Sequence, residues 1–108
     1  RSFQYAVEGG LRSHIDRGLS PEDDRAALAL RGHLWQRWVT NRYLSGYLGH
    51  AAGRSFVPDR SEDVALLLRA FILEKALYEV RYELANRPHW VGWPLAAVSE
   101  TLAGTVWP

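Results

Sequence analysis

The segment from residue 61 to residue 95 constrains the fold more than any other part of the chain. A capping serine, Ser61, is followed by two acids, which is typical of a helix start. Apolar residues then recur at helical spacing as far as Asn86. Pro88 disfavours helical geometry at the residue before it. The pattern therefore predicts one long helix from Ser61 to Asn86, with the Arg87 guanidinium placed at its end.

This helix is expected to have two different faces. The residues that share one side of a helical wheel, and form the expected core stripe, are Leu73, Leu77, Val80 and Leu84. The residues that share the opposite side are Lys75, Tyr78, Glu79, Tyr82 and Asn86. A solvated surface explains the charged residues of this second face. Two tyrosines among charges also suit a polyhydroxylated ligand or another protein chain, because rings stack on apolar patches while charged groups bind hydroxyls.

Three further helices are expected from the spacing of the apolar residues. The first lies at the start of the chain and ends near Gly9–Gly10 or a little later. The second begins at Ser20 and reaches Ala51, with Gly32 as a weak point inside it. The last begins at Pro94. The apolar stripes of the first and last helices are Phe3, Val7 and Leu11, and Leu95, Val98 and Leu102. With no convincing strand, the chain is predicted to be an all-α fragment.

Composition narrows the range of functions. The formal charge of +1 favours neither nucleic acid nor an anionic membrane as a partner. The absence of Cys excludes disulfides, thiolate metal sites and a thiolate nucleophile. The four His are too scattered for a metal-ligand pattern. No apolar run has the length of a membrane helix, and no signal peptide opens the chain, so a soluble cytoplasmic protein is expected.

The aromatic residues include five Trp, a large number for 108 residues, and favour packing against a neighbouring domain. Trp35, Trp38 and Tyr43 lie at helical spacing, which indicates core positions more often than a ligand shelf. The chain lacks an initial Met, and its first apolar pattern lacks a capping residue. We therefore expect a single helical subdomain, residues 1–108, cut from a longer protein.

No catalytic motif is convincing within these residues. His14 and Asp16 have the spacing of the HxD of a kinase catalytic loop. Pro21, however, stands where such a loop needs a metal-binding Asn, so a surface loop is expected there. Gly9–Gly10 lacks both the spacing and the preceding strand of a phosphate-binding loop. Neither a catalytic residue nor a metal or nucleotide site is predicted in the chain itself.

Two parts of the sequence resemble a known family. FILEKALYE at 71–79, the pattern YELxNRPxWV at 82–91 and Pro94–Leu95 resemble the C-terminal end of maltokinases, which also occur fused to trehalose synthase. The pattern RSFxYA at 1–6 resembles the end of the segment that follows the metal-binding aspartate loop in that family. Trp93 and His89 depart from the family, which usually has a smaller aliphatic residue and an acid at these positions.

The resemblance implies a protein-kinase-like fold, similar to aminoglycoside phosphotransferases, of which this chain would be the helical C-lobe subdomain. The intact enzyme would use ATP and Mg²⁺ to convert maltose to maltose 1-phosphate for glycogen synthesis. Its catalytic residues would lie outside this chain, which alone would be inactive and bind no cofactor. The resemblance also implies that Glu79 and Arg87 bind sugar hydroxyls, with Lys75, Tyr78 and Tyr82 nearby.

The implied partners are maltose, the rest of the kinase and a trehalose synthase domain, fused or associated. The alternative is a noncatalytic helical module whose tyrosine-bearing face docks a protein.

Overall fold

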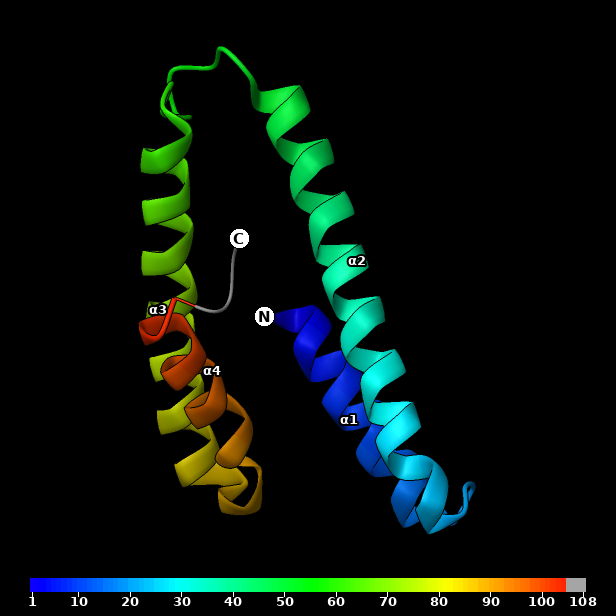
Figure 1. Cartoon of the computed structure of the whole chain (residues 1–108). Coiled ribbons are helices and arrows are strands. Elements are labelled where there is room, and N and C mark those ends of the chain that lie inside the picture. Colours follow the sequence, from blue (N-terminus) through cyan, green and yellow to red (C-terminus); the bar gives the residue numbers. More distant parts are fainter. Residues whose placement is uncertain (105–108) are drawn as a thin grey trace. The chain divides into compact units, whose positions relative to one another are not determined.

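The computed structural model describes residues 1–104, and these residues form helices and connecting turns with no strand. The chain divides into two compact units, Arg1–Ala52 and Gly53–Pro108. Figure 1 shows that each unit is a helical hairpin. The predicted all-α class is confirmed, whereas the kinase C-lobe origin and the single subdomain stay predictions.

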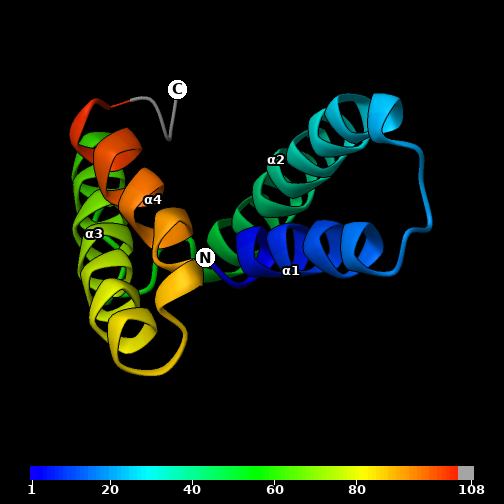
Figure 2. The ribbon, with the colours of Figure 1, turned by 90° about the horizontal axis from the view of Figure 1, so that it is seen from below.

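The first unit contains α1 (Ser2–Asp16), the short 3-10 helix η1 (Glu22–Asp24) and α2 (Arg25–Ala51). Helix α1 runs antiparallel to α2 and lies along its N-terminal half (Figure 2). Val7 is buried, and Phe3 and Leu11 on the same stripe are half-buried, as the spacing predicts. A Cβ on Gly32 would lie 2.6 Å from Val7 Cγ1. The missing side chain of Gly32 therefore allows the two helices to approach closely at Val7.

Helix α1 is longer than the sequence predicts. It continues through Gly9–Gly10 to Asp16, so His14 lies in its last turn and the expected surface loop is wrong. The chain leaves this helix at Gly18, whose φ of 63° is a conformation that glycine adopts without steric cost. Ser20 does not cap α2, because its hydroxyl contacts the ring of His14 and the α-helix begins only at Arg25.

The second unit contains α3 (Ser61–Asn86), the 3-10 turn η2 (Pro88–Trp90) and α4 (Gly92–Leu102). Helix α3 has the predicted limits, although Ser61 is its first helical residue and makes no capping hydrogen bond. Helix α4 starts two residues before the predicted Pro94. It runs back along the C-terminal half of α3 (Figures 1 and 2).

The two helices of the second unit bury small and polar residues at their contact, not the predicted leucine stripes. The residues buried there are Ala76, Glu79 and Glu83 on α3 and Pro94, Ala97 and Thr101 on α4. Leu77, Leu84, Leu95 and Leu102 are exposed, and Leu73, Val80 and Val98 are only half-buried. Ala76 and Ala97 are small enough for the two helices to meet at these positions, and the larger Glu79 and Glu83 are buried on the same side of α3. The predicted core stripe of α3 is therefore wrong for Leu77 and Leu84, and its other two residues are only half-buried.

The interpretation of the α2 aromatics as core residues is also wrong. Trp35, Trp38 and Tyr43 are exposed, at 47%, 60% and 61%. Phe3 on α1 contacts Trp35 and Tyr43 edge to face, with ring centroids 6.4 and 6.0 Å apart. The rings of Trp35 and Tyr43 therefore pack at the edge of the α1–α2 contact and remain largely in water.

Candidate functional site

The candidate site is built around the end of α3, where Pro88 stops the helix. Arg87 leaves helical geometry, with φ −143° and ψ 69°, as the residue before a proline is expected to do. Its backbone N–H still donates to the carbonyl of Glu83, 2.7 Å away. Its carbonyl accepts a 2.8 Å hydrogen bond from the N–H of Trp90. The η2 turn therefore folds the chain back on itself directly after α3, and Trp90 lies close to Arg87.

The Arg87 side chain is held by two hydrogen bonds to one carboxylate. Its Nε donates to Glu83 Oε2 at 2.9 Å, and its Nη2 donates to Glu83 Oε1 at 2.7 Å. Glu83 is only 1% exposed, whereas the Arg87 side chain is 39% exposed. Paired charge-assisted hydrogen bonds of this kind fix both distance and orientation. The buried carboxylate therefore anchors a guanidinium that reaches the surface.

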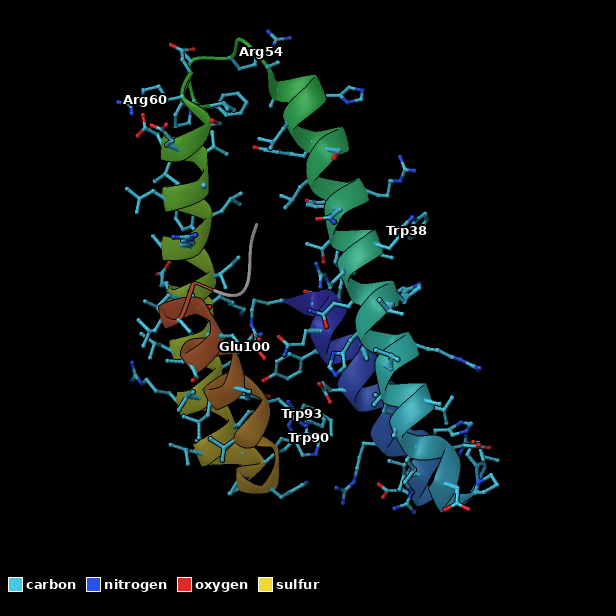
Figure 3. The ribbon with its side chains drawn as sticks, viewed as in Figure 1. Trp38, Arg54, Arg60, Trp90, Trp93 and Glu100 are labelled. Carbon is cyan, nitrogen blue, oxygen red and sulfur yellow. The ribbon has the colours of Figure 1, made fainter. Side chains whose placement is uncertain are left out.

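Two aromatic rings also lie close to the Arg87 guanidinium. Its Cζ lies 4.0 Å from the ring centroid of Trp90 and 5.6 Å from that of Tyr82. The rings of Trp90 and Trp93 are 4.4 Å apart, and Figure 3 shows these two side chains together near the start of α4. A guanidinium over a tryptophan face gains a favourable cation–π interaction. Arg87 is thus held at its edge by Glu83 and on its face by Trp90.

Four of the five predicted site residues lie in a continuous series of contacts. Lys75 Nζ is 4.4 Å from the ring centroid of Tyr78. The ring centroids of Tyr78 and Tyr82 are 6.4 Å apart, with an interplanar angle of 22°. The Tyr82 ring in turn lies 5.6 Å from Arg87 Cζ. Both tyrosines are exposed, at 57% and 45%. We name Lys75, Tyr78, Tyr82 and Arg87 the cation–tyrosine row.

Glu79, the fifth predicted residue, does not lie on this exposed face. It is 8% exposed and lies on the buried side of α3 with Ala76 and Glu83. Helix α4 covers that side, which the wheel alone could not show. The expectation that Glu79 shares an exposed stripe with Tyr78 and Tyr82 is therefore wrong in its placement.

Sequence reasoning missed two residues of the site, Glu83 and Trp90. The spacing of Glu83 and Arg87, four positions apart, is typical of an ion pair on one helix face and was an available signal. Trp90 had no comparable signal, because its approach to Arg87 depends on the conformation of η2.

The cation–tyrosine row offers two cations and two tyrosine rings that are about half exposed. Such groups bind a hydroxylated ligand by donating hydrogen bonds to its oxygens and stacking on its C–H surfaces. Within residues 1–104, no group of three or more His, Asp or Glu side chains is arranged to hold a metal ion. No helix in the same residues has the length and apolarity needed to cross a membrane.

The first unit contains an open apolar groove between α1 and α2. Its lining residues are Ala6, Val7, Gly10, Leu11, His14, Leu28, Gly32 and Trp35. Apart from His14, whose ring contacts the Ser20 hydroxyl, these residues provide no polar side-chain group except the indole N–H of Trp35. The groove therefore suits a polar ligand less well than the cation–tyrosine row.

No protein-family model matches the chain, and no solved structure matches it.

Proposed function

We propose that this chain is the C-terminal, sugar-binding part of a maltokinase-like enzyme, which transfers the γ-phosphate of ATP to maltose and gives maltose 1-phosphate. The observation that supports the proposal is the cation–tyrosine row on α3, in the same segment that resembles maltokinases. Under this proposal the chain binds and orients the acceptor sugar. ATP, Mg²⁺ and the catalytic base belong to the rest of the kinase.

The row suits this task because a disaccharide presents both hydroxyls and apolar C–H faces. Lys75 and Arg87 have N–H groups that can donate to hydroxyl oxygens, and the rings of Tyr78 and Tyr82 offer stacking surfaces. Glu79 is buried at the α3–α4 contact. Under this proposal it would therefore influence sugar binding indirectly, through the packing of the two helices. The proposed setting is cytoplasmic glycogen synthesis, with a trehalose synthase domain fused or associated.

The test is steady-state kinetics of the full-length protein that carries this chain. Lys75→Ala and Tyr82→Ala should each raise the KM for maltose about tenfold, since a hydrogen bond from a charged group or a stacking contact contributes about 1 to 3 kcal/mol. The kcat and the KM for ATP should stay within about twofold. Arg81→Ala is the matched control, because Arg81 is an exposed cation on α3 outside the row. An unchanged maltose KM in both row variants would remove the proposal.

A second candidate function is favoured by a separate observation. Seventeen large hydrophobic side chains are exposed among the described residues, including Trp38, Phe71 and Leu84. Contiguous exposed apolar surface is characteristic of a protein that packs against another protein, and the exposed Leu66, Leu77 and Leu84 share one side of α3. A noncatalytic helical interaction module would explain it. The reading frame upstream of Arg1 distinguishes the two candidates, because a maltokinase requires a catalytic aspartate loop there.

A further inference from the structure

We infer that Glu83 is a positioning residue, which sets the orientation of Arg87 for binding the acceptor sugar. This inference rests on the proposed function and adds a residue that the sequence resemblance does not assign. It also predicts that Trp90 affects sugar binding through its contact with Arg87.

Glu83 and Trp90 each restrict one rotational freedom of the Arg87 guanidinium. Two parallel hydrogen bonds, of 2.9 and 2.7 Å, fix the direction in which the Nε–Nη2 edge points. The Trp90 ring, 4.0 Å from Arg87 Cζ, fixes the plane of the group from one face. An arginine held in this way loses little further freedom when it binds a ligand, so its hydrogen bonds to the ligand cost less entropy.

The direction of control follows from burial. The Glu83 carboxylate is 1% exposed and lies on the buried side of α3 with Ala76 and Glu79, so it has little room to move. The Arg87 side chain is 39% exposed and follows the last helical residue, where the backbone has already left the helix. Without the carboxylate, a long side chain at a helix end would sample many rotamers. Glu83 therefore acts on Arg87, and Arg87 faces the ligand.

The simpler explanation is an ion pair that only stabilises the end of α3. A stabilising pair would change the melting temperature when broken, but it would leave the affinity for maltose unchanged. A positioning pair would change both. The maltose KM is therefore the readout that separates the two explanations, and the local environment of the Arg87 Nε–H group tests only whether the contact itself exists.

Glu83→Gln is the first test variant, in the full-length enzyme. A glutamine has the size of glutamate, but only one of its two terminal groups, the carbonyl, can accept a hydrogen bond. Its NH₂ group cannot accept from either of the two N–H donors of Arg87. One of the two contacts is then lost. We expect the maltose KM to rise about five- to tenfold, with kcat and the ATP KM within about twofold.

Arg87→Lys is the second variant, and it guards against a folding defect in Glu83→Gln. It keeps the positive charge opposite the buried carboxylate, but it removes the planar two-point contact. A comparable rise in the maltose KM is expected, with an unchanged far-UV circular dichroism spectrum. In the double variant Glu83→Gln/Arg87→Ala, the maltose KM should equal that of Arg87→Ala alone, because this inference assigns Glu83 an effect on sugar binding through Arg87.

A spectroscopic readout is independent of activity. In the wild-type protein the Nε–H of Arg87 should give a distinct NMR signal that exchanges slowly with water, because it is bonded to a buried carboxylate. Glu83→Gln should move this signal and accelerate its exchange at least severalfold. An unmoved signal, or a maltose KM unchanged in Glu83→Gln and Arg87→Lys, overturns the inference.

The outcomes separate this inference from the proposed function. If Lys75→Ala and Tyr82→Ala raise the maltose KM but Glu83→Gln and Arg87→Lys do not, the positioning role is wrong and the sugar site stands. If the full-length wild-type protein does not phosphorylate maltose, the proposed function is wrong and the inference fails with it, even where the NMR signal responds as expected.

Discussion

Gly32 is the residue whose role differs most from its sequence interpretation. A glycine inside a helix destabilises it, and the sequence marks this position as a weak point of the second helix. The structure gives it a packing role, since a Cβ there would lie 2.6 Å from Val7 Cγ1. Helix propensity therefore favours alanine at this position, while the contact with α1 opposes it.

Gly32→Ala should lower the free energy of unfolding by about 1 kcal/mol. Overpacking against the buried Val7 costs about 1 to 3 kcal/mol, and the gain in helix propensity offsets only about 1 kcal/mol of this. Gly46 is the matched control on α2, because a Cβ there would meet nothing within 4 Å. Gly46→Ala should raise the free energy of unfolding by about 1 kcal/mol. Urea denaturation of both variants measures the difference, and equal effects would contradict the close approach.

The site residues show how far single positions can be predicted. Lys75, Tyr78 and Tyr82 were placed together because helical spacing alone puts them on one face. Glu79 belongs to the same face on the wheel, but α4 covers it. The sequence carries no signal for which side of α3 another helix will cover. That side also decides that Glu83 is buried, and hence that Arg87 is anchored.

At the scale of helices, the limits of the elements were more predictable than their contacts. The stop at Pro88 and the long α3 followed from local backbone chemistry, and both are confirmed. The buried faces of α3 and α4 are displaced from the leucine stripes to neighbouring residues such as Ala76 and Ala97. Hydrophobic periodicity indicates an apolar face, but close helix packing selects small residues, and the two criteria disagree here.

Two adjacent residues of α3 test this displacement directly. Ala76 is 0% exposed at the contact with α4, and Leu77 beside it is 49% exposed. Ala76→Leu should destabilise the chain by about 2 to 3 kcal/mol, because three additional carbons must enter a closed helix contact. Leu77→Ala should cost about 1 kcal/mol or less, because the leucine is already half in water. Thermal unfolding followed by circular dichroism measures both, and the reverse order would restore the predicted leucine core.

At the scale of the whole chain, the leucine stripes and aromatic rings that the helical hairpins leave uncovered need an explanation. Leu66, Leu77 and Leu84 lie on one side of α3 and are 66%, 49% and 58% exposed. Apolar surface of this kind normally packs against another part of a protein or another chain. Under the proposed function, the rest of the kinase would cover it, in keeping with the large number of Trp in the sequence.

The exposed stripe of Leu66, Leu77 and Leu84 should make the 108-residue chain self-associate in solution. We expect it to bind a hydrophobic fluorescent dye and to self-associate as its concentration rises, because apolar area in water favours association at about 25 cal/mol per Å². Replacing Leu66, Leu77 and Leu84 by Gln should reduce both effects and retain the helix content, since Gln is a good helix former. Replacing the exposed Asp63, Glu74 and Arg81 by Gln on the same helix is the control, and it should leave dye binding unchanged. Sedimentation velocity measures the association.

A monomeric wild-type chain that binds no dye would mean that this surface is covered in solution. That result would remove the main support for an interaction module.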